Sequence, residues 1–222
     1  MRWCPPAIGL LLMLGCTTLP VPVREPMEAT PAVSEDADDP LTLAAECLAR
    51  GDEPAAATQF EIHVRLHPEQ VMFRLHLADL LMKVHRLKEA QQHYERFIAD
   101  VQDSTGSPKT HLVHCHTRLM EIAQLTNDRF AELLHRGIGL ALLTRQETDD
   151  SETREEMLCK AIKSLLEAKA YRPTDARVHV YLAEAYERAG NRRAAEVARA
   201  TARNLVMPGA LTPSESRGLA LE

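Results

Sequence analysis

The clearest pattern of apolar and polar positions lies between residues 176 and 205. Leu182, Ala183 and Tyr186 recur at the spacing of one helix face. Gly190 then interrupts the pattern, and Ala195 lies on a second helical stretch. The pattern therefore predicts two helices joined by a tight turn, with small side chains where the helices approach each other.

The same pattern occurs in earlier parts of the chain at a fixed distance. Positions 34 residues apart correspond to one another: Leu43-Ala44, Gly51, Ala56 and Phe60 match Leu77-Ala78, His85, Ala90 and Tyr94. Ala161 and Ala195 are separated by the same 34 residues. A period of this length, with large and small positions preserved, is typical of stacked helical hairpins.

These residues carry a resemblance to a known family. The spacing L-[G/A]-x-x-Y, followed by the alanine of a second helix, resembles the tetratricopeptide (TPR) repeat. Pro68 and Pro173 end two of the segments where the family places a proline, whereas His85 replaces a family glycine and Arg199 a usual aromatic residue. The resemblance implies an all-α, TPR-like α-solenoid of stacked antiparallel helical hairpins over residues 41–207. It is strong at 41–102 and 174–206 and weak between them.

The apolar periodicity also predicts where the individual helices lie. Before the hairpin at 176–205 we expect helices at about 41–50, 54–66, 70–84, 87–102, 110–126, 128–146 and 153–171. Asp128 is placed to cap its helix, and Thr153 with Glu156 has the spacing of a capping box. Gly137 and Gly139 indicate a kink or a close helix crossing. Residues 208–222, which contain Pro and Gly, are expected to form a flexible tail.

The first residues have the features of a targeting segment. Arg2 precedes a short apolar run at 7–14, and Gly15-Cys16 follows it. This arrangement resembles a bacterial lipobox, although Met13 stands where that motif prefers leucine. The resemblance implies a signal peptide at 1–15, a lipid on Cys16 and an outer-membrane address. An ordinary secretory signal with an incidental Cys16 is the alternative. Residues 16–40 are rich in Pro, Asp and Glu, so we expect an extended tether there.

Composition narrows the function classes. The chain has 222 residues with 26 basic and 32 acidic side chains, a formal charge of −6, and is therefore a poor general partner for nucleic acid. Its 4% aromatic content suits packed Ala and Leu helices better than a β-sandwich. After loss of 1–15 and acylation of Cys16, Cys47, Cys115 and Cys159 remain. We expect these cysteines to act as small, buried, apolar side chains, or two of them to form a disulfide in an oxidising envelope.

Histidines supply the only candidate for metal chemistry. His111, His114, Cys115 and His116 form the densest cluster, with His111 and Cys115 four residues apart on one helix face. Imidazole and thiolate suit zinc or copper, but no two-cysteine pair or H-E-x-x-H motif accompanies them. Solvated surface histidines are the simpler interpretation. The Ser-nucleophile, P-loop and dinucleotide motifs are absent from the sequence as well, so we expect neither an enzyme nor a cofactor.

A recognition surface is the remaining expectation. In TPR proteins the first helix of each hairpin lines a concave side that binds extended peptides or helices. By the resemblance, this side would contain Met72, Leu75, His76, Asp79 and Lys83 in the second repeat, and Arg177, Val180, Tyr181, Glu184 and Arg188 in the last. Packing between neighbouring repeats is the alternative role for Leu75 and Val180. The sequence thus predicts a lipid-anchored, non-catalytic scaffold of the bacterial envelope that binds a protein or peptide partner. The alternatives are a metal-handling envelope protein that uses the His111–His116 cluster and a self-associating structural lipoprotein.

Overall fold

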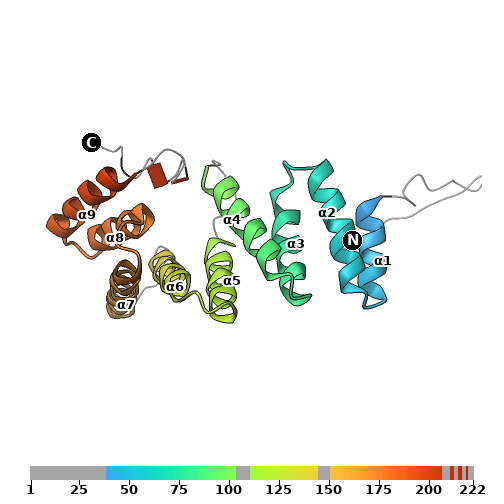
Figure 1. The fold of residues 1–222 in the computed structure, drawn as a ribbon, viewed down its shortest axis with the longest axis horizontal. Coiled ribbons are helices and arrows are strands. Elements are labelled where there is room, and N and C mark those ends of the chain that lie inside the picture. The colour runs from blue at the N-terminus through green and yellow to red at the C-terminus, as the bar shows by residue number, and fades with distance from the viewer. Residues whose placement is uncertain are drawn as a thin grey trace, which may run out of the picture. The chain divides into compact units, whose positions relative to one another are not determined.

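The computed structural model describes residues 39–103, 111–144 and 151–206, together with 211, 212, 215, 216 and 219. These residues form helices and no strands (Figure 1). The helices are α1 (Pro40–Ala49), α2 (Glu53–Leu66), α3 (Val71–Lys83), α4 (Leu87–Asp103), α5 (Leu112–Leu125), α6 (Arg129–Leu143), α7 (Ser151–Tyr171), α8 (Ala176–Arg188) and α9 (Arg192–Leu205). The predicted bounds agree with them within a few residues.

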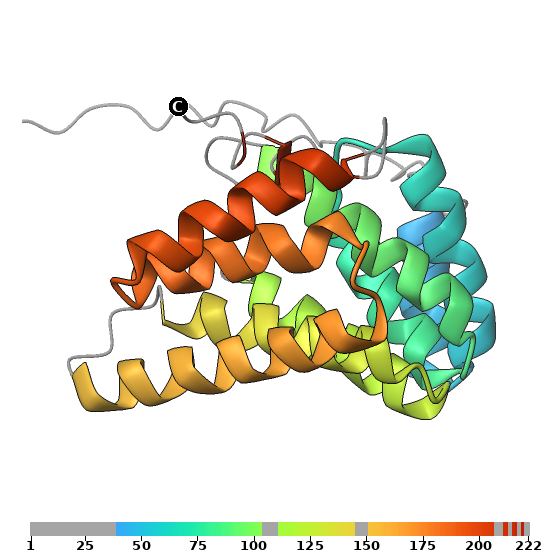
Figure 2. The same ribbon diagram turned by 60° about the vertical axis from the view of Figure 1, so that its left-hand side comes forward.

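Neighbours in sequence are neighbours in space. The hairpins α1–α2, α3–α4, α5–α6 and α8–α9 pack as antiparallel pairs, and α7 packs against both α6 and α8. Figure 2 shows α8 between α9 and the α6–α7 pair. The fold class predicted from the 34-residue period, an all-α, TPR-like solenoid of stacked helical hairpins, is confirmed.

One turn geometry joins the two helices of four hairpins. A residue with positive φ follows the first helix each time: Gly51 (75°), His85 (60°), Asn127 (58°) and Gly190 (76°). In three of them the next residue caps the second helix through its side-chain oxygen, which accepts from the backbone N–H three residues on: Asp52, Asp128 and Asn191. The predicted Asp128 cap is confirmed, and His85 adopts the left-handed conformation of the family glycine that it replaces.

Small residues allow these pairs to approach closely. Ala56, Ala90 and Ala195 lie five residues after their left-handed turn residues and are almost completely buried. In α6 the corresponding position is Glu132, which is also buried and accepts hydrogen bonds from Arg129 (2.6 Å) and Gln124 (3.2 Å). This carboxylate in a position for alanine explains why residues 110–147 match the repeat pattern poorly.

Helices α6 and α7 approach each other closely at Gly137. A Cβ atom added at Gly137 would lie 2.6 Å from Cγ of Leu165 and 3.2 Å from the carbonyl oxygen of Ala161. Glycine is therefore required here by space, as a close crossing predicts. At Gly139 the nearest atom, Cβ of His116, would lie at an ordinary 3.8 Å.

Two details of the ends differ from the prediction. The helical region starts slightly earlier than expected, because Asp39 caps α1 and Pro40 is its first residue. The Thr153–Glu156 capping box is wrong, because α7 begins at Ser151 and Thr153 lies inside it. The predicted signal peptide, Cys16 and nearly all of the tether lie outside the described residues. None of the described helices is both long and apolar enough to span a membrane.

Candidate functional site: a groove between α4 and α8

A groove of about 250 Å³ lies among α4, α5, α6 and α8, and we call it the α4–α8 groove. Its polar lining comes from α4, α5, α6 and α8 and from the carboxy-terminal residues Thr212 and Glu215. The members used below are Glu95 and Gln102 of α4, His116 of α5, His135 of α6, and Arg177 and Tyr181 of α8. Ile98, Leu119, Leu134 and Ile138 form its apolar floor. The groove therefore combines charged donors and acceptors with an apolar base, as a peptide-binding surface requires.

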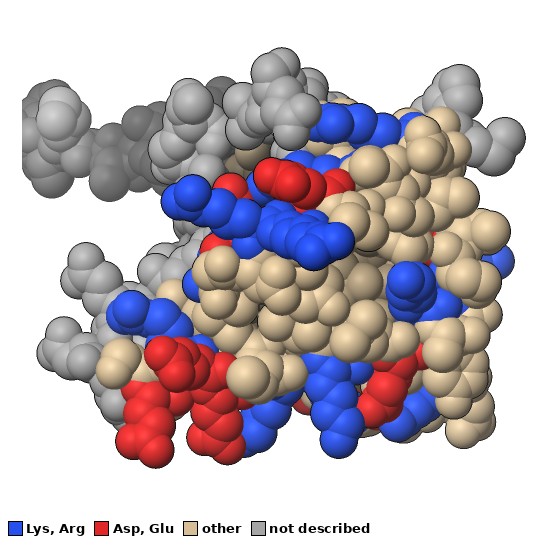
Figure 3. Space-filling model, turned by 90° about the vertical axis from the view of Figure 1, so that its left-hand side faces the viewer, with Lys and Arg blue, Asp and Glu red and all other residues tan. Residues whose placement is uncertain are grey.

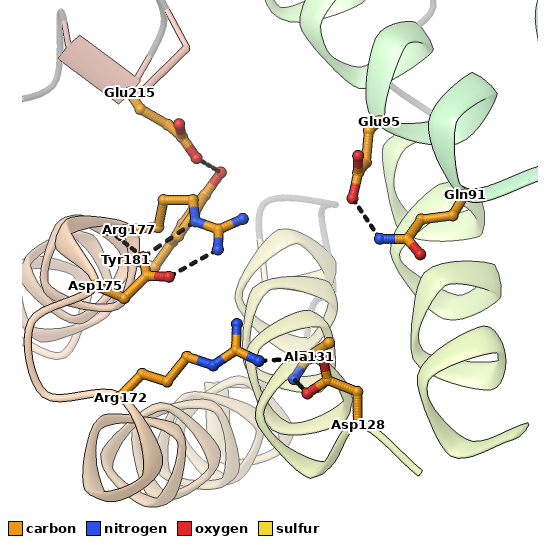
Figure 4. Close-up of polar contacts among 9 residues, drawn as sticks. All are labelled: Gln91, Glu95, Asp128, Ala131, Arg172, Asp175, Arg177, Tyr181 and Glu215. Carbon is orange, nitrogen blue, oxygen red and sulfur yellow. Dashed lines mark hydrogen bonds and ion pairs between the residues drawn. The ribbon is translucent and has the colours of Figure 1, made fainter. Parts of the chain in front are cut away.

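Arg177 is held rigidly at one wall. Asp175 caps α8 by accepting from the backbone N–H of Arg177 (3.0 Å), and its carboxylate also accepts from Nε (3.1 Å) and Nη2 (2.7 Å) of the same residue. These bonds, and the charges of Asp175, Glu215 and Glu95, raise the pKa of Arg177 despite its burial. Figure 4 shows the guanidinium pointing into the space between α8 and α4, with Glu95 on the opposite side. Arg177 is thus a preorganised cation inside the groove.

Tyr181 stands one helical turn further along α8. Its hydroxyl donates to Oε1 of Glu215 at 2.9 Å (Figure 4). Burial, followed by the charge of Glu215 and this hydrogen bond, raises the pKa of Tyr181. The phenol therefore stays protonated at neutral pH. Together Arg177 and Tyr181 offer a positive charge and a hydrogen-bond donor to a carboxylate, and neither can act as a proton acceptor.

The other predicted residues of α8 have structural contacts. Val180 is buried and packs with Ala202 and Leu219. Arg188 donates to the carbonyl oxygen of Ala141 in α6 (2.6 Å) and forms an ion pair with Glu184 (2.5 Å). Arg177 and Tyr181 line the groove, while Val180 and Arg188 contact neighbouring elements and Glu184 pairs with Arg188 within α8.

The predicted residues of the second repeat lie apart from the groove. Leu75 is buried in the core and Met72 packs against it, whereas His76 and Lys83 are exposed. Asp79 accepts from the hydroxyl of buried Tyr94 at 2.5 Å and lies 2.8 Å from Nε2 of His114. Asp79 therefore links α3 to α4 and α5.

The four residues of the histidine cluster point in different directions. The ring of His111 meets Phe97 edge-on, His114 faces Asp79, and Cys115 is buried in the core. Burial, and secondarily the charge of Asp79, raises the pKa of Cys115 to about 12, so its thiol stays protonated. Within the described ranges no three His, Cys, Asp or Glu side chains are grouped so that they could hold a metal ion. The arrangement does not favour the metal-handling alternative.

Glu95, His135 and Glu215 are among the groove residues that were not predicted from the sequence. Glu95 lies on a second helix of a hairpin, accepts from Gln91 at 2.8 Å and faces α8 (Figure 4). His135 lies beside His116, and Glu215 belongs to the region expected to be a flexible tail. The sequence contained a signal only for Glu215, because Thr212-Pro-Ser-Glu215 has the spacing of a capping box.

Figure 3 views the end of the molecule at which α7, α8 and α9 lie. Acidic side chains gather at the lower left of this face, basic side chains lie at several other places, and most of its middle and right is uncharged. Exposed apolar side chains occur on the same helices, with Leu166 of α7 and Val197 of α9 lining a shallow depression. Cys47 and Cys115 are buried and Cys159 is exposed, and all three are free thiols.

Comparison with known proteins gives distant structural similarity only. No family model matches the chain, and no curated protein matches it. Among solved structures, "Crystal structure of MamA" has 16% identity over 73% of this chain and 94% of that chain, with a TM-score of 0.40. A thermophilic TPR protein from Thermus thermophilus, TTC0263, has 21% identity over 75% of this chain and 72% of that chain, with a TM-score of 0.37. MamA from Desulfovibrio magneticus RS-1 has 13% identity over 78% of this chain and 97% of that chain, with a TM-score of 0.38. At these values the function has to be argued from the chain's own geometry.

Proposed function

We propose that this protein is a non-catalytic interaction scaffold of the bacterial cell envelope, and that it binds a partner peptide or helix in the α4–α8 groove. Lipid on Cys16 anchors it to the membrane, most simply on the periplasmic face of the outer membrane. The partner is a protein, and neither nucleic acid nor a cofactor is required.

The observation that carries this proposal is the preorganised pair of Arg177 and Tyr181 above an apolar floor. Both side chains are polar donors held in place by α8, and Asp175 fixes the guanidinium before any ligand arrives. Preorganisation lowers the entropic cost of binding, and a fixed guanidinium suits a carboxylate. The raised pKa values of both groups support recognition and give no support to acid–base catalysis.

The envelope location is supported by the amino-terminal sequence alone. Arg2, the apolar run and Gly15-Cys16 have the order of a lipoprotein signal, and the Pro- and acid-rich residues 16–40 would hold the helices away from the membrane. A single acyl chain binds a membrane only reversibly, so the several chains of a lipoprotein are needed for a stable anchor.

Affinity capture from the native envelope tests the proposal. A tagged wild-type chain is compared with Glu95→Lys, which places a second cation opposite Arg177, and with Glu196→Lys, the same change at an exposed position of α9. We expect a defined set of proteins with the wild type and Glu196→Lys, and its loss with Glu95→Lys. Cys16→Ser is expected to release the protein from the membrane fraction. Identical captures from both charge variants would contradict a role for the groove.

Self-association is the second candidate, because Leu166 of α7 is 43% and Val197 of α9 is 62% exposed and both line one depression. Sedimentation of the wild type and of Val197→Ser distinguishes it. A mass that rises with concentration in the wild type alone would assign the α7–α9 surface to a second copy.

A further inference from the structure

Three described residues of the carboxy-terminal segment 211–219 line the α4–α8 groove: Leu211, Thr212 and Glu215. Glu215 is 9% and Leu219 7% exposed, although both follow the last helix of the solenoid. Leu219 packs with Val180 of α8 and Ala202 of α9, and Leu211 lies against the same cluster. Arg203 Nε donates to the carbonyl oxygen of Leu219 at 2.9 Å. The segment is therefore held by apolar contacts, backbone contacts and the bond from Tyr181.

The segment also has local order of its own. The backbone N–H of Thr212 donates to Oε2 of Glu215 (2.8 Å), and the N–H of Glu215 donates to the hydroxyl of Thr212 (3.3 Å). The N–H of Ser216 donates to the carbonyl oxygen of Thr212 at 2.9 Å. This reciprocal pair is a capping box at the start of a helical turn. One carboxylate oxygen of Glu215 caps its own turn while the other accepts from Tyr181.

The charges of the groove explain why the segment presents an acidic residue to it. Arg177 lies close enough to Glu215 for the carboxylate to raise its pKa, and Tyr181 donates directly to it. Leu211 lines the groove together with Glu215, whereas Leu219 packs outside it against Val180 and Ala202. The groove therefore faces an acid and one leucine of this segment.

We propose that segment 211–219 is an intramolecular ligand of the α4–α8 groove, and that a partner must present the same chemistry to displace it: a carboxylate on a capped helical turn, with a leucine directly before the cap. This inference rests on the proposed function, because it names the class of ligand for the same groove.

The length of the connection supports occupation by the chain's own segment. Only residues 207–210 separate Val206, at the end of α9, from Leu211. A tether this short gives the segment an effective concentration in the millimolar range. A free peptide therefore competes poorly until the segment is released.

The test uses a fluorescent peptide of residues 208–222 and the full chain in detergent. The chain is studied as wild type, as Glu215→Gln with Leu219→Ala, and as Ser216→Ala, whose side chain is exposed on the same segment. We expect weak peptide binding to the wild type and to Ser216→Ala, and at least tenfold tighter binding to the double variant. Adding Tyr181→Phe to the double variant should then weaken binding about tenfold or more, the effect of losing one hydrogen bond to a charged group. Glu215→Gln alone should bind with intermediate affinity.

Two results would overturn the proposal. Equal binding by the wild type and the double variant, with the helical circular dichroism of both intact, would show that the segment does not occupy the groove. A wild-type dimer that dissociates in the double variant would assign the segment to a second copy. The peptide measurement needs no unknown partner, so an empty capture from the envelope would refute the proposed function without changing this result.

Discussion

The Nδ1 atoms of His116 and His135 lie 3.1 Å apart across the contact of α5 and α6. At this distance one ring donates its Nδ1–H and the other accepts with a bare Nδ1, so the pair needs at least one neutral ring in a defined tautomer. The Nε2 atom of His116 is buried and has no hydrogen-bond partner among the described residues. A second proton on the His116 ring would place an unpaired charge in the interior.

This pair should make the protein sensitive to mild acid. Burial, and then its neighbour His135, lowers the pKa of His116 well below its ordinary value, while burial and the charge of Arg177 lower the pKa of His135 to about 3. Below the ordinary histidine pKa of about 6.5, the unfolded chain binds protons that the folded chain does not. Stability is therefore present above that pH and is lost progressively as the pH falls from about 6.5 toward 3.

Urea unfolding between pH 7.5 and 4.5 measures the effect. Each histidine that stays neutral in the folded state contributes a slope of up to about 1.4 kcal/mol per pH unit in the free energy of unfolding. His135→Gln should flatten the curve by about one such slope, whereas His76→Gln, at an exposed position, should leave it unchanged. If the free energy of unfolding has the same pH slope in the wild type and both variants, His135 is not the source of the acid sensitivity.

Gly137→Ala should destabilise the crossing of α6 and α7. The new methyl group would overlap Cγ of Leu165 and press on the carbonyl oxygen of Ala161, neither of which is the free end of a side chain. Overpacking of this kind costs about 1–3 kcal/mol. Gly139→Ala in the same helix has ordinary space and should be neutral or should stabilise by up to about 1 kcal/mol, since alanine favours helix. Denaturant unfolding compares the two variants. Equal losses in the free energy of unfolding would contradict the prediction that the space around each glycine decides the effect.

The hairpins could be predicted from the sequence because local signals determine them. Gly51 and Gly190 mark left-handed turns, and the alanines that follow mark close helix contacts, so a fixed period predicts the pairing without any knowledge of distant residues. His85 is harder to interpret from sequence, since its conformation is imposed by the surrounding hairpin.

The groove could be predicted only in part. Arg177 and Tyr181 follow from the helix face that the repeat assigns to the concave side, and the structure places both in the groove. The pairing of His116 with His135 depends on the register between two helices, which the apolar pattern does not specify. His114 and His116 are close together in the sequence cluster, but they face Asp79 and His135 on different neighbours. Proximity in sequence therefore suggested a shared site that helix geometry separates.

His85→Gly should stabilise the second hairpin. A left-handed residue other than glycine costs about 1–2 kcal/mol, part of which is offset because glycine has a more disordered unfolded state. The expected net gain is up to about 1 kcal/mol in the free energy of unfolding. Gly190→Ala is the reverse control, because it introduces a side chain at a left-handed position. The new methyl group would have open space around it, so the expected loss of about 1 kcal/mol in the free energy of unfolding would come from backbone strain alone. A loss of stability in His85→Gly would show that the imidazole makes a contribution that outweighs the backbone strain.

Asp79 should prove important for stability before any role in partner binding. Its carboxylate accepts from Tyr94 and lies beside His114, and Arg118 is 3.8 Å away, so it joins α3 to α4 and α5. A hydrogen bond to a charged group contributes about 1.5–3 kcal/mol. Asp79→Asn removes the charge and keeps the size, and we expect it to lower the free energy of unfolding by an amount in that range.

Lys83→Ala provides the comparison on the same helix. Lys83 is exposed and its ion pair with Glu53 is 3.8 Å long, so its loss should cost less than about 1 kcal/mol. Thermal and urea unfolding of both variants, followed by capture of envelope partners, separates the two roles. If Asp79→Asn retains full stability but loses the captured proteins, the carboxylate acts in recognition and the contact with Tyr94 is secondary.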